Sequence, residues 1–187
     1  MTIDTLIKGG TVIDGTGSEA YTADIAITKG AITDIGRITQ RATRVIDADG
    51  AIVTPGLVDM HTHYDGQATW ANRMSPSSHF GVTTVIAGNC GVGFAPVYPE
   101  DREKVVELME GVEEIPGAVL NEGINWQWET FPEYMDYLDG KKFDMDIGVQ
   151  IPHAPMRVYV MGQRALDREP ATPSDIAAMR KLTREAM

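Results

Sequence analysis

The sequence lacks the features that mark disulfide-stabilised, membrane-spanning and nucleic-acid-binding proteins. It has one cysteine in 187 residues, so no disulfide can form within the chain. No apolar stretch approaches the roughly 20 residues that cross a bilayer, and no basic segment followed by an apolar one begins the chain. Lysine and arginine do not cluster, and the net charge is −11, which argues against a phosphate-backbone partner. We therefore expect a cytoplasmic protein with neither a nucleic-acid nor a membrane partner.

The composition is that of a globular protein, and its first part reads as a small sheet. Hydrophobic residues make up 43% and charged residues 23% of the chain, which is enough for one core. Residues 1–55 show short strands with polar faces, separated by turn-forming pairs. The predicted turns fall at Gly9-Gly10, Lys29-Gly30 and Asp49-Gly50. This pattern predicts an antiparallel sheet that is too thin to be stable alone.

The pattern changes at Thr54-Pro55-Gly56, where a second region, residues 56–187, begins. Short apolar strands now alternate with helical segments, which is typical of βα units and a parallel sheet. The strands are predicted at residues 57–63, 82–90 and 145–151. An insertion at about residues 92–142 separates the second strand from the third. It is far longer than the usual loop between a strand and a helix. The chain is thus predicted to have an α/β fold.

Helix signals occur within the insertion and near the end of the chain. One helix is predicted around Val105 and Met109, and Thr130 with Glu133 forms a capping box for a second. Thr172 is the predicted N-cap of a last helix, which reaches Met187 without a stop signal. Insertions of this kind after a barrel strand usually cover or shape a site. We also expect the chain to break off there rather than to finish.

His61 and His63 are the strongest candidates for metal ligands. Residues two apart in a strand share a face, so these imidazoles and Asp59 should project to one side. Neutral imidazole is a common zinc ligand. A His-x-His pair also arises by chance, and its histidines can be structural. Its place at the carboxyl end of a strand that opens a βα series favours metal ligation.

Cys90 is predicted to end the second strand, at the same edge of the sheet as the two histidines. A lone cysteine is usually a small buried hydrophobic residue. Glycines on both sides allow close approach of the backbone there, and a thiolate could ligate or bridge metal ions. Asp59 is assigned an indirect or structural role, and Asp65 is expected to be solvated or to cap a helix. The general base cannot be named among these residues.

Other polar and aromatic residues are weaker candidates. His153, predicted at the end of the third strand, either lines the site or has a structural role. Arg157 could bind a substrate carboxylate, although an ion pair elsewhere is the simpler expectation. His79 is expected to be solvated or to cap a helix end. Trp126 and Trp128 are predicted to be packing anchors of the insertion.

At these residues the sequence closely resembles the metal-dependent amidohydrolase superfamily, in particular its D-aminoacylase (N-acyl-D-amino-acid deacylase) branch. The His-x-His strand marks the superfamily, whereas the stretches around Cys90 and Trp126 are more specific to the branch. The matching segments are TPGLVDMHTHYDGQ, SPSSHFGVTTVIAGNCGVGFAP, LMEGVEEIPG, EGINWQWETFPEYMDYLD and RVYVMG.

The resemblance implies a fold, a cofactor and a substrate class. The fold would be a β-sandwich beside a TIM barrel, of which residues 1–55 and 56–187 would supply the first parts. One or two zinc ions would be bound, with His61 and His63 at one metal position. Cys90 would do the bridging job that a carboxylated lysine does in many relatives. The substrates would be N-acyl-D-amino acids, cleaved to a carboxylate and a D-amino acid.

The sequence departs from the family's pattern after His153, where no further histidine occurs. The family takes two more histidine ligands and a catalytic aspartate from later strands. We therefore expect the barrel to be incomplete, the general base to lie beyond Met187 and the isolated chain to be inactive. An unfinished barrel could also self-associate through exposed apolar surface. The alternatives are a cyclic-amide hydrolase such as a hydantoinase, a related dipeptidase, and a non-catalytic fragment.

Overall fold

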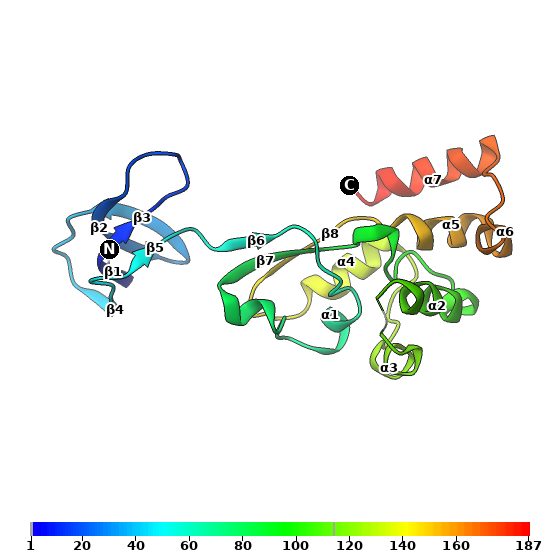
Figure 1. Ribbon diagram of the computed structural model, residues 1–187, viewed down its shortest axis with the longest axis horizontal. Coiled ribbons are helices and arrows are strands. Elements are labelled where there is room, and N and C mark those ends of the chain that lie inside the picture. Colours follow the sequence, from blue (N-terminus) through cyan, green and yellow to red (C-terminus); the bar gives the residue numbers. More distant parts are fainter. Residues whose placement is uncertain (1, 114) are drawn as a thin grey trace. The chain divides into compact units, whose positions relative to one another are not determined.

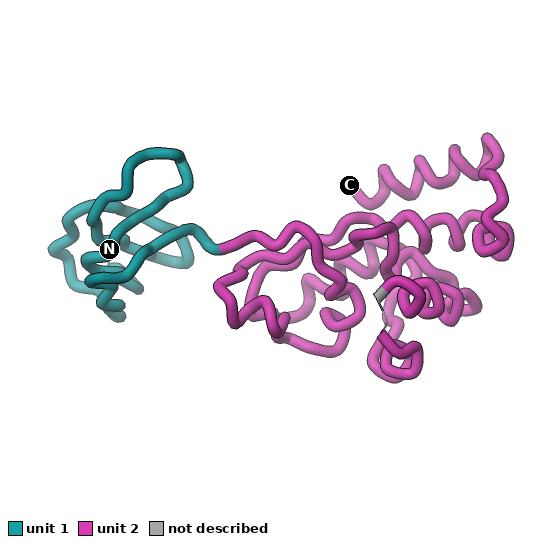
Figure 2. Tube along the Cα trace, in the orientation of Figure 1, with its two compact units in different colours: residues 1–56 teal, residues 57–187 magenta. Residues whose placement is uncertain are grey.

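The computed structural model describes residues 2–113 and 115–187. Met1 and Glu114, which fall in the predicted first sheet and in the predicted insertion, lie outside the described residues. The chain divides into two compact units, residues 1–56 and residues 57–187 (Figure 2). Each unit has its own sheet, and each is described by itself.

The first unit is a five-stranded sheet. The strands are β1 (Ile3–Val12), β2 (Tyr21–Thr28), β3 (Ala31–Gly36), β4 (Ala42–Asp47) and β5 (Ile52–Val53). Strand β1 pairs antiparallel with β2 and parallel with both β4 and β5, and the order is β3-β2-β1-β4. The prediction of a purely antiparallel sheet is therefore wrong. The chain crosses from β3 at one edge to β4 at the other edge, and a crossover delivers a parallel strand.

One predicted turn in this unit is a bulge instead. Gly9 and Gly10 lie inside β1, where the register against β2 shifts between Ile7 and Gly10. Gly9 has a φ of +73°, and its N–H donates to Asp24 Oδ1 at 2.9 Å. Glycine permits this left-handed residue within a strand, so the strand continues through the pair.

The second unit is built on a parallel sheet (Figure 1). Its strands are β6 (Leu57–Asp59), β7 (Val82–Ala87) and β8 (Asp146–Val149), in the order β6-β7-β8. Both pairings are parallel. The expectation of a mixed α/β fold is confirmed, but the strands are shorter than predicted.

Local backbone features follow the ends of β6 and β7. Asp59 Oδ1 accepts the N–H of His61 at 3.2 Å, a local bond that competes with strand pairing. After β7, Gly88 takes a left-handed conformation with a φ of +79°. His61 and His63 therefore lie in the loop after β6, and Cys90 lies in a short helical turn after β7.

Helices and short turns follow and connect the strands. They are α1 (Gln67–Trp70), η1 (Ser77–Phe80), η2 (Asn89–Gly91), η3 (Pro99–Asp101), α2 (Arg102–Glu113), α3 (Gly117–Gly123), α4 (Phe131–Asp139), α5 (His153–Met161), α6 (Gln163–Leu166) and α7 (Pro173–Glu185). The capping box predicted at Thr130 and Glu133 begins α4, and Thr172 caps α7 as predicted. Among the described helices none combines the length and apolarity needed to cross a membrane.

The core of the second unit lies between the sheet and the insertion. Val85 of β7 is fully buried, and its neighbours in the core include Phe94, Trp128 and Tyr134. The Trp128 indole N–H donates to the Phe94 carbonyl at 2.7 Å. Trp128 is thus the packing anchor that the sequence predicts, while Trp126 is half-buried at the margin of the same core.

Candidate metal centre

Three predicted ligands come together at the carboxyl ends of β6 and β7. One donor atom from each of His61, His63 and Cys90 lies within 4.8 Å of the others. His61 Nε2 is 3.2 Å from Cys90 Sγ, and the two imidazole centroids are 5.4 Å apart. His61 and Cys90 are exposed and His63 is half-buried. The two loops therefore present their donors to one accessible point.

The loop after β6 is anchored by the residue between the two histidines. Thr62 is buried, and both its N–H and its hydroxyl donate to the Ile86 carbonyl, at 3.0 and 2.9 Å. Because Thr62 is directed inward against β7, its neighbours His61 and His63 project from the other side of the loop. The His-x-His spacing thus places both imidazoles on one side of an anchored loop, not on one face of a paired strand.

The Cys90 turn has an unusual backbone. Gly88 and Cys90 both have positive φ values, +79° and +53°. A side chain at position 88 is excluded, since a Cβ there would stand 2.0 Å from the Gln150 carbonyl oxygen. A residue with a β-carbon rarely occupies the left-handed region, as Cys90 does, and such outliers concentrate at functional sites.

Asp65 and Asn89 are polar residues whose roles the sequence analysis missed or misjudged. Asp65 is 1% exposed, so the expectation that it is solvated is wrong, and the alternative of a cap fails for α1, whose N-cap is Gly66 and which has no side-chain cap hydrogen bond. Its Oδ1 accepts the Gly88 N–H at 2.8 Å, which ties the histidine loop to the Cys90 turn. Asn89 hydrogen-bonds to Thr62 and Ile86. The bonds from Asp65 to Gly88 and from Asn89 to Thr62 join residues more than 20 apart, so no local pattern in the sequence could have identified them.

The remaining candidates lie at different places. His153 begins α5 instead of ending a strand, and it stands beside the Cys90 turn, with its Cβ 3.6 Å from where a Gly91 Cβ would be. Arg157 donates through Nη2 to the Glu169 carbonyl at 2.8 Å. His79 is exposed in η1, before β7 begins, with Nε2 3.3 Å from Ser75 Oγ. Only His153 adjoins the cluster.

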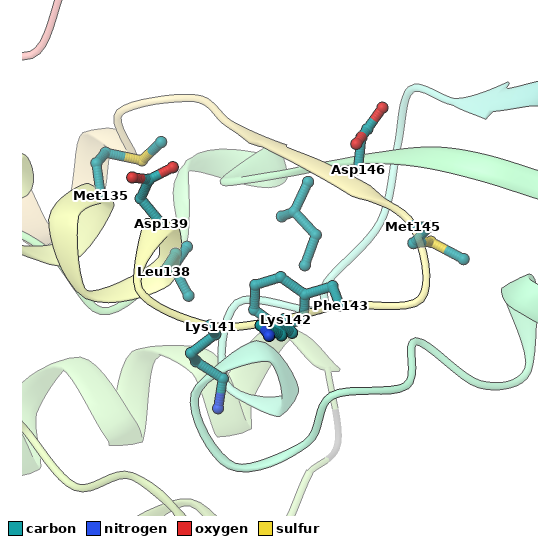
Figure 3. Close-up of a pocket in the computed structure, with 9 residues that line it drawn as sticks. Met135, Leu138, Asp139, Lys141, Lys142, Phe143, Met145 and Asp146 are labelled. Atoms are coloured by element: carbon teal, nitrogen blue, oxygen red, sulfur yellow. The ribbon is translucent and has the colours of Figure 1, made fainter. Parts of the chain in front are cut away.

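A separate hollow of about 580 Å³ opens near the start of β8 (Figure 3). Its walls come from the end of α4, the following loop and β8. They are formed by Met135, Leu138, Asp139, Lys141, Lys142, Phe143, Met145, Asp146 and Ile147. The strands are parallel, so this hollow lies toward their amino ends, whereas Cys90 follows the carboxyl end of β7. The hollow and the three donors are therefore at opposite ends of the sheet.

The donor set suits a zinc ion. Zinc binds imidazole nitrogen at about 2.0–2.1 Å and thiolate sulfur at about 2.3 Å, so two ligands of a tetrahedral ion are about 3.5 Å apart. The 3.2 Å between His61 Nε2 and Cys90 Sγ is close to that spacing. Imidazole and thiolate together are ligands that zinc accepts readily.

Comparison with known proteins agrees with this fold. The model of the amidohydrolase family matches residues 44–187. The chain belongs to the amidohydrolase family. The resemblance seen in the sequence is confirmed, since D-aminoacylase of Alcaligenes xylosoxydans xylosoxydans is 35% identical over 187 residues. This alignment covers 98% of the present chain and 35% of the relative.

Two solved structures are similar over nearly the whole chain. A D-aminoacylase studied for its binuclear metal center is 31% identical, with a TM-score of 0.79, and 98% of this amidohydrolase matches 36% of that chain. N-acyl-D-glutamate deacylase from Bordetella bronchiseptica, complexed with zinc and a phosphonate inhibitor, is 29% identical with a TM-score of 0.77. There the coverage is 100% of this chain and 36% of the other. The chain thus spans about a third of the length of these relatives.

Proposed function

We propose that this protein is a metal-dependent hydrolase of linear amide C–N bonds, which cleaves N-acyl-D-amino acids to a carboxylate and a D-amino acid. The observation that carries the proposal is the convergence of His61, His63 and Cys90 within 4.8 Å. The substrate class is supported by the D-aminoacylase and the N-acyl-D-glutamate deacylase that the chain resembles over 98–100% of its length. We also propose that β6–β8 belong to a TIM barrel and β1–β5 to a β-sandwich.

The proposed roles follow from the chemistry of each side chain. His61 and His63 would each donate a neutral imidazole nitrogen to one metal position, and Cys90 would supply a thiolate that holds or bridges one or two zinc ions. When bound, zinc supplies Lewis-acid polarisation of an amide carbonyl and lowers the pKa of water. Thr62 and Asp65 would hold the His-x-His loop in place against β7 and the Cys90 turn, through hydrogen bonds to Ile86 and Gly88. His153, exposed beside the Cys90 turn, is the residue here that we propose for substrate contact.

Arg157 is a weaker candidate for binding the substrate carboxylate. Its Nη2 is engaged by the Glu169 carbonyl at 2.8 Å, and a guanidinium held in that way presents fewer N–H groups to a ligand. A cyclic-amide hydrolase or a dipeptidase of the same family is the alternative reaction. We favour the linear amide because a D-aminoacylase and an N-acyl-D-glutamate deacylase are among the relatives that match nearly the whole chain.

The metal assignment can be tested on the 187-residue chain. We expect the wild-type chain to retain zinc after gel filtration, and Cys90→Ala and His61→Ala to lose most of it. His79→Ala is the matched control, because that histidine is exposed in η1, away from the three donors. Unchanged zinc content in Cys90→Ala would contradict the ligand assignment.

The substrate class needs an assay with a complete site. Because the chain spans 35% of the Alcaligenes D-aminoacylase, residues 1–187 can replace the segment of that enzyme that they match. We expect the chimera to hydrolyse N-acetyl-D-methionine but not the L enantiomer, and Cys90→Ala to lower kcat at least 100-fold. A zinc-loaded chimera that cleaves only a cyclic amide such as hydantoin would favour the alternative reaction. Folded, zinc-loaded protein with no activity on either would support a non-catalytic role.

A further inference from the structure

The Asn89 side chain links the two loops that carry the proposed ligands. Its Nδ2 donates to the Ile86 carbonyl at 2.8 Å and to the Thr62 carbonyl at 3.3 Å. Ile86 belongs to β7, and Thr62 stands between the two histidines. One amide group therefore joins the His-x-His loop to the end of the neighbouring strand.

The other end of the same amide reaches the third strand. Asn89 Oδ1 accepts from Gln150 Nε2 at 3.1 Å, and Gln150 directly follows β8. The Gln150 N–H in turn donates to the Ala87 carbonyl at 3.0 Å. Asn89 thus bonds to segments at the carboxyl ends of β6, β7 and β8, which is the edge where the donors gather.

The position of Asn89 in its turn explains why such bonds matter. It lies between Gly88 and Cys90, which both have left-handed backbones. Glycine adopts that conformation freely, but Cys90 does not, so other contacts must hold the turn in place. In this turn Cys90 Sγ comes to 3.2 Å from His61 Nε2. A relaxed turn would move the thiol away from the imidazole.

We propose that Asn89 is a positioning residue that sets Cys90 against His61 before a metal ion binds. This inference rests on the proposed metal site and adds a residue that does not itself ligate. Residues that orient metal ligands commonly contribute about 10–100-fold to metal affinity. A merely structural Asn89 would change the stability of the chain without acting through the thiol.

A double-mutant cycle on the 187-residue chain separates the two roles. Cobalt(II) is titrated into the wild type, Asn89→Ala, Cys90→Ala and the double variant, and the thiolate-to-cobalt absorption per bound ion is recorded. We expect Asn89→Ala to weaken cobalt binding about 10–100-fold and to reduce that absorption. In the Cys90→Ala background the same change should weaken binding clearly less than in the wild type, because the thiol it positions is gone and the change then reaches the histidines only through the lost bond to the Thr62 carbonyl.

Asn125→Ala is the matched control. Asn125 Nδ2 donates to the Tyr137 hydroxyl at 2.7 Å, so the variant also removes an asparagine hydrogen bond, but away from the three donors. We expect its cobalt affinity to stay within about twofold of the wild type. If Asn89→Ala does not fold, Gln150→Ala removes only the bond to Oδ1 and should weaken cobalt binding about threefold. Unchanged affinity in Gln150→Ala would then overturn the proposal.

The outcomes distinguish this inference from the metal site on which it rests. If Cys90→Ala leaves cobalt affinity unchanged, the metal site itself is wrong and the role of Asn89 falls with it. If Cys90→Ala weakens binding but Asn89→Ala does not, only the positioning role is overturned. An equal loss from Asn89→Ala in both backgrounds would also overturn it, since the asparagine would then act independently of the thiol.

Discussion

The imidazole of His61 and the thiol of Cys90 lie side by side, with Nε2 and Sγ 3.2 Å apart, although 29 residues separate them in the chain. The parallel pairing of β6 with β7 explains the encounter, because the loops that leave the carboxyl ends of neighbouring parallel strands meet at one edge. Cys90 is the single cysteine of the sequence and is exposed. Its reactivity therefore reports directly on this edge.

We predict that zinc protects Cys90 from alkylation. The thiolate is the reactive form, and a thiolate that ligates zinc has its lone pair engaged. Saturating zinc should slow the reaction of the chain with iodoacetamide at least about tenfold, as followed by mass spectrometry. The protection should disappear in His61→Ala and persist in His79→Ala. Equal alkylation rates with and without zinc would count against Cys90 as a ligand.

Gly88→Ala is predicted to destabilise the chain more than Gly81→Ala does. Both glycines have a φ near +80°. A Cβ added at position 88 would lie 2.0 Å from the Gln150 carbonyl oxygen, whereas a Cβ added at position 81 would have no neighbour within 4 Å. Gly81→Ala should cost only the left-handed backbone penalty of about 1–2 kcal/mol. The clash should add about 1–3 kcal/mol for Gly88→Ala.

Urea unfolding of the two alanine variants, followed by circular dichroism, measures this difference. Equal free energies of unfolding would show that the Cys90 turn can move away from Gln150 without cost. In that event the close approach of Gly88 to Gln150 would not constrain the ligand-bearing loop.

The sequence predicted the convergence of His61, His63 and Cys90 better than it predicted the local backbone that carries them. His61 and His63 are two residues apart, and the prediction placed them on one face of a strand. In the structure β6 ends at Asp59, and the histidines project together because Thr62 is anchored to Ile86. The spacing predicted that the two histidines lie together, as they do, because an anchored loop residue separates its neighbours much as a pleated strand does.

Contacts between distant residues account for what the sequence could not predict. Asp65 was expected at the surface, yet a bond to the Gly88 N–H holds it inside the unit. The antiparallel first sheet is predicted from short strands with polar faces and the turns between them, and the β3-to-β4 crossover leaves no signal in either. By contrast, the capping box of Thr130 and Glu133 depends on residues three apart, and the structure confirms it.

Trp128→Phe should destabilise the second unit by about 1–3 kcal/mol. Trp128 is 3% exposed, and its indole N–H satisfies the Phe94 carbonyl at 2.7 Å. Phenylalanine fills most of the volume but leaves that carbonyl without this donor. Trp126→Phe is the control, because that ring is half-buried and a phenyl ring can keep its contacts with Phe94 and Trp128. The change weakens the contact with the Arg102 guanidinium, which is worth about 1 kcal/mol or less. Urea unfolding should therefore rank Trp128→Phe as the less stable variant.

Glu133 is predicted to make the stability of the chain depend on pH in the acid range. The backbone N–H groups of Thr130 and Glu129 donate to its Oε2, both at 2.9 Å, and they hold the pKa of the Glu133 carboxyl below its usual value. A carboxyl with a lowered folded-state pKa favours the folded state above its unfolded pKa, and this contribution is lost as the pH falls through the folded pKa.

Glu133→Gln isolates that contribution, because the amide has nearly the same shape but does not titrate. The wild type should be more stable than the variant at about pH 6, and the difference should shrink as the pH is lowered toward about 3. Asp136→Asn, on the same helix but outside the capping box, controls for the removal of one negative charge. A wild-type advantage that stays constant between these pH values would mean that the ionised carboxylate adds nothing to the cap.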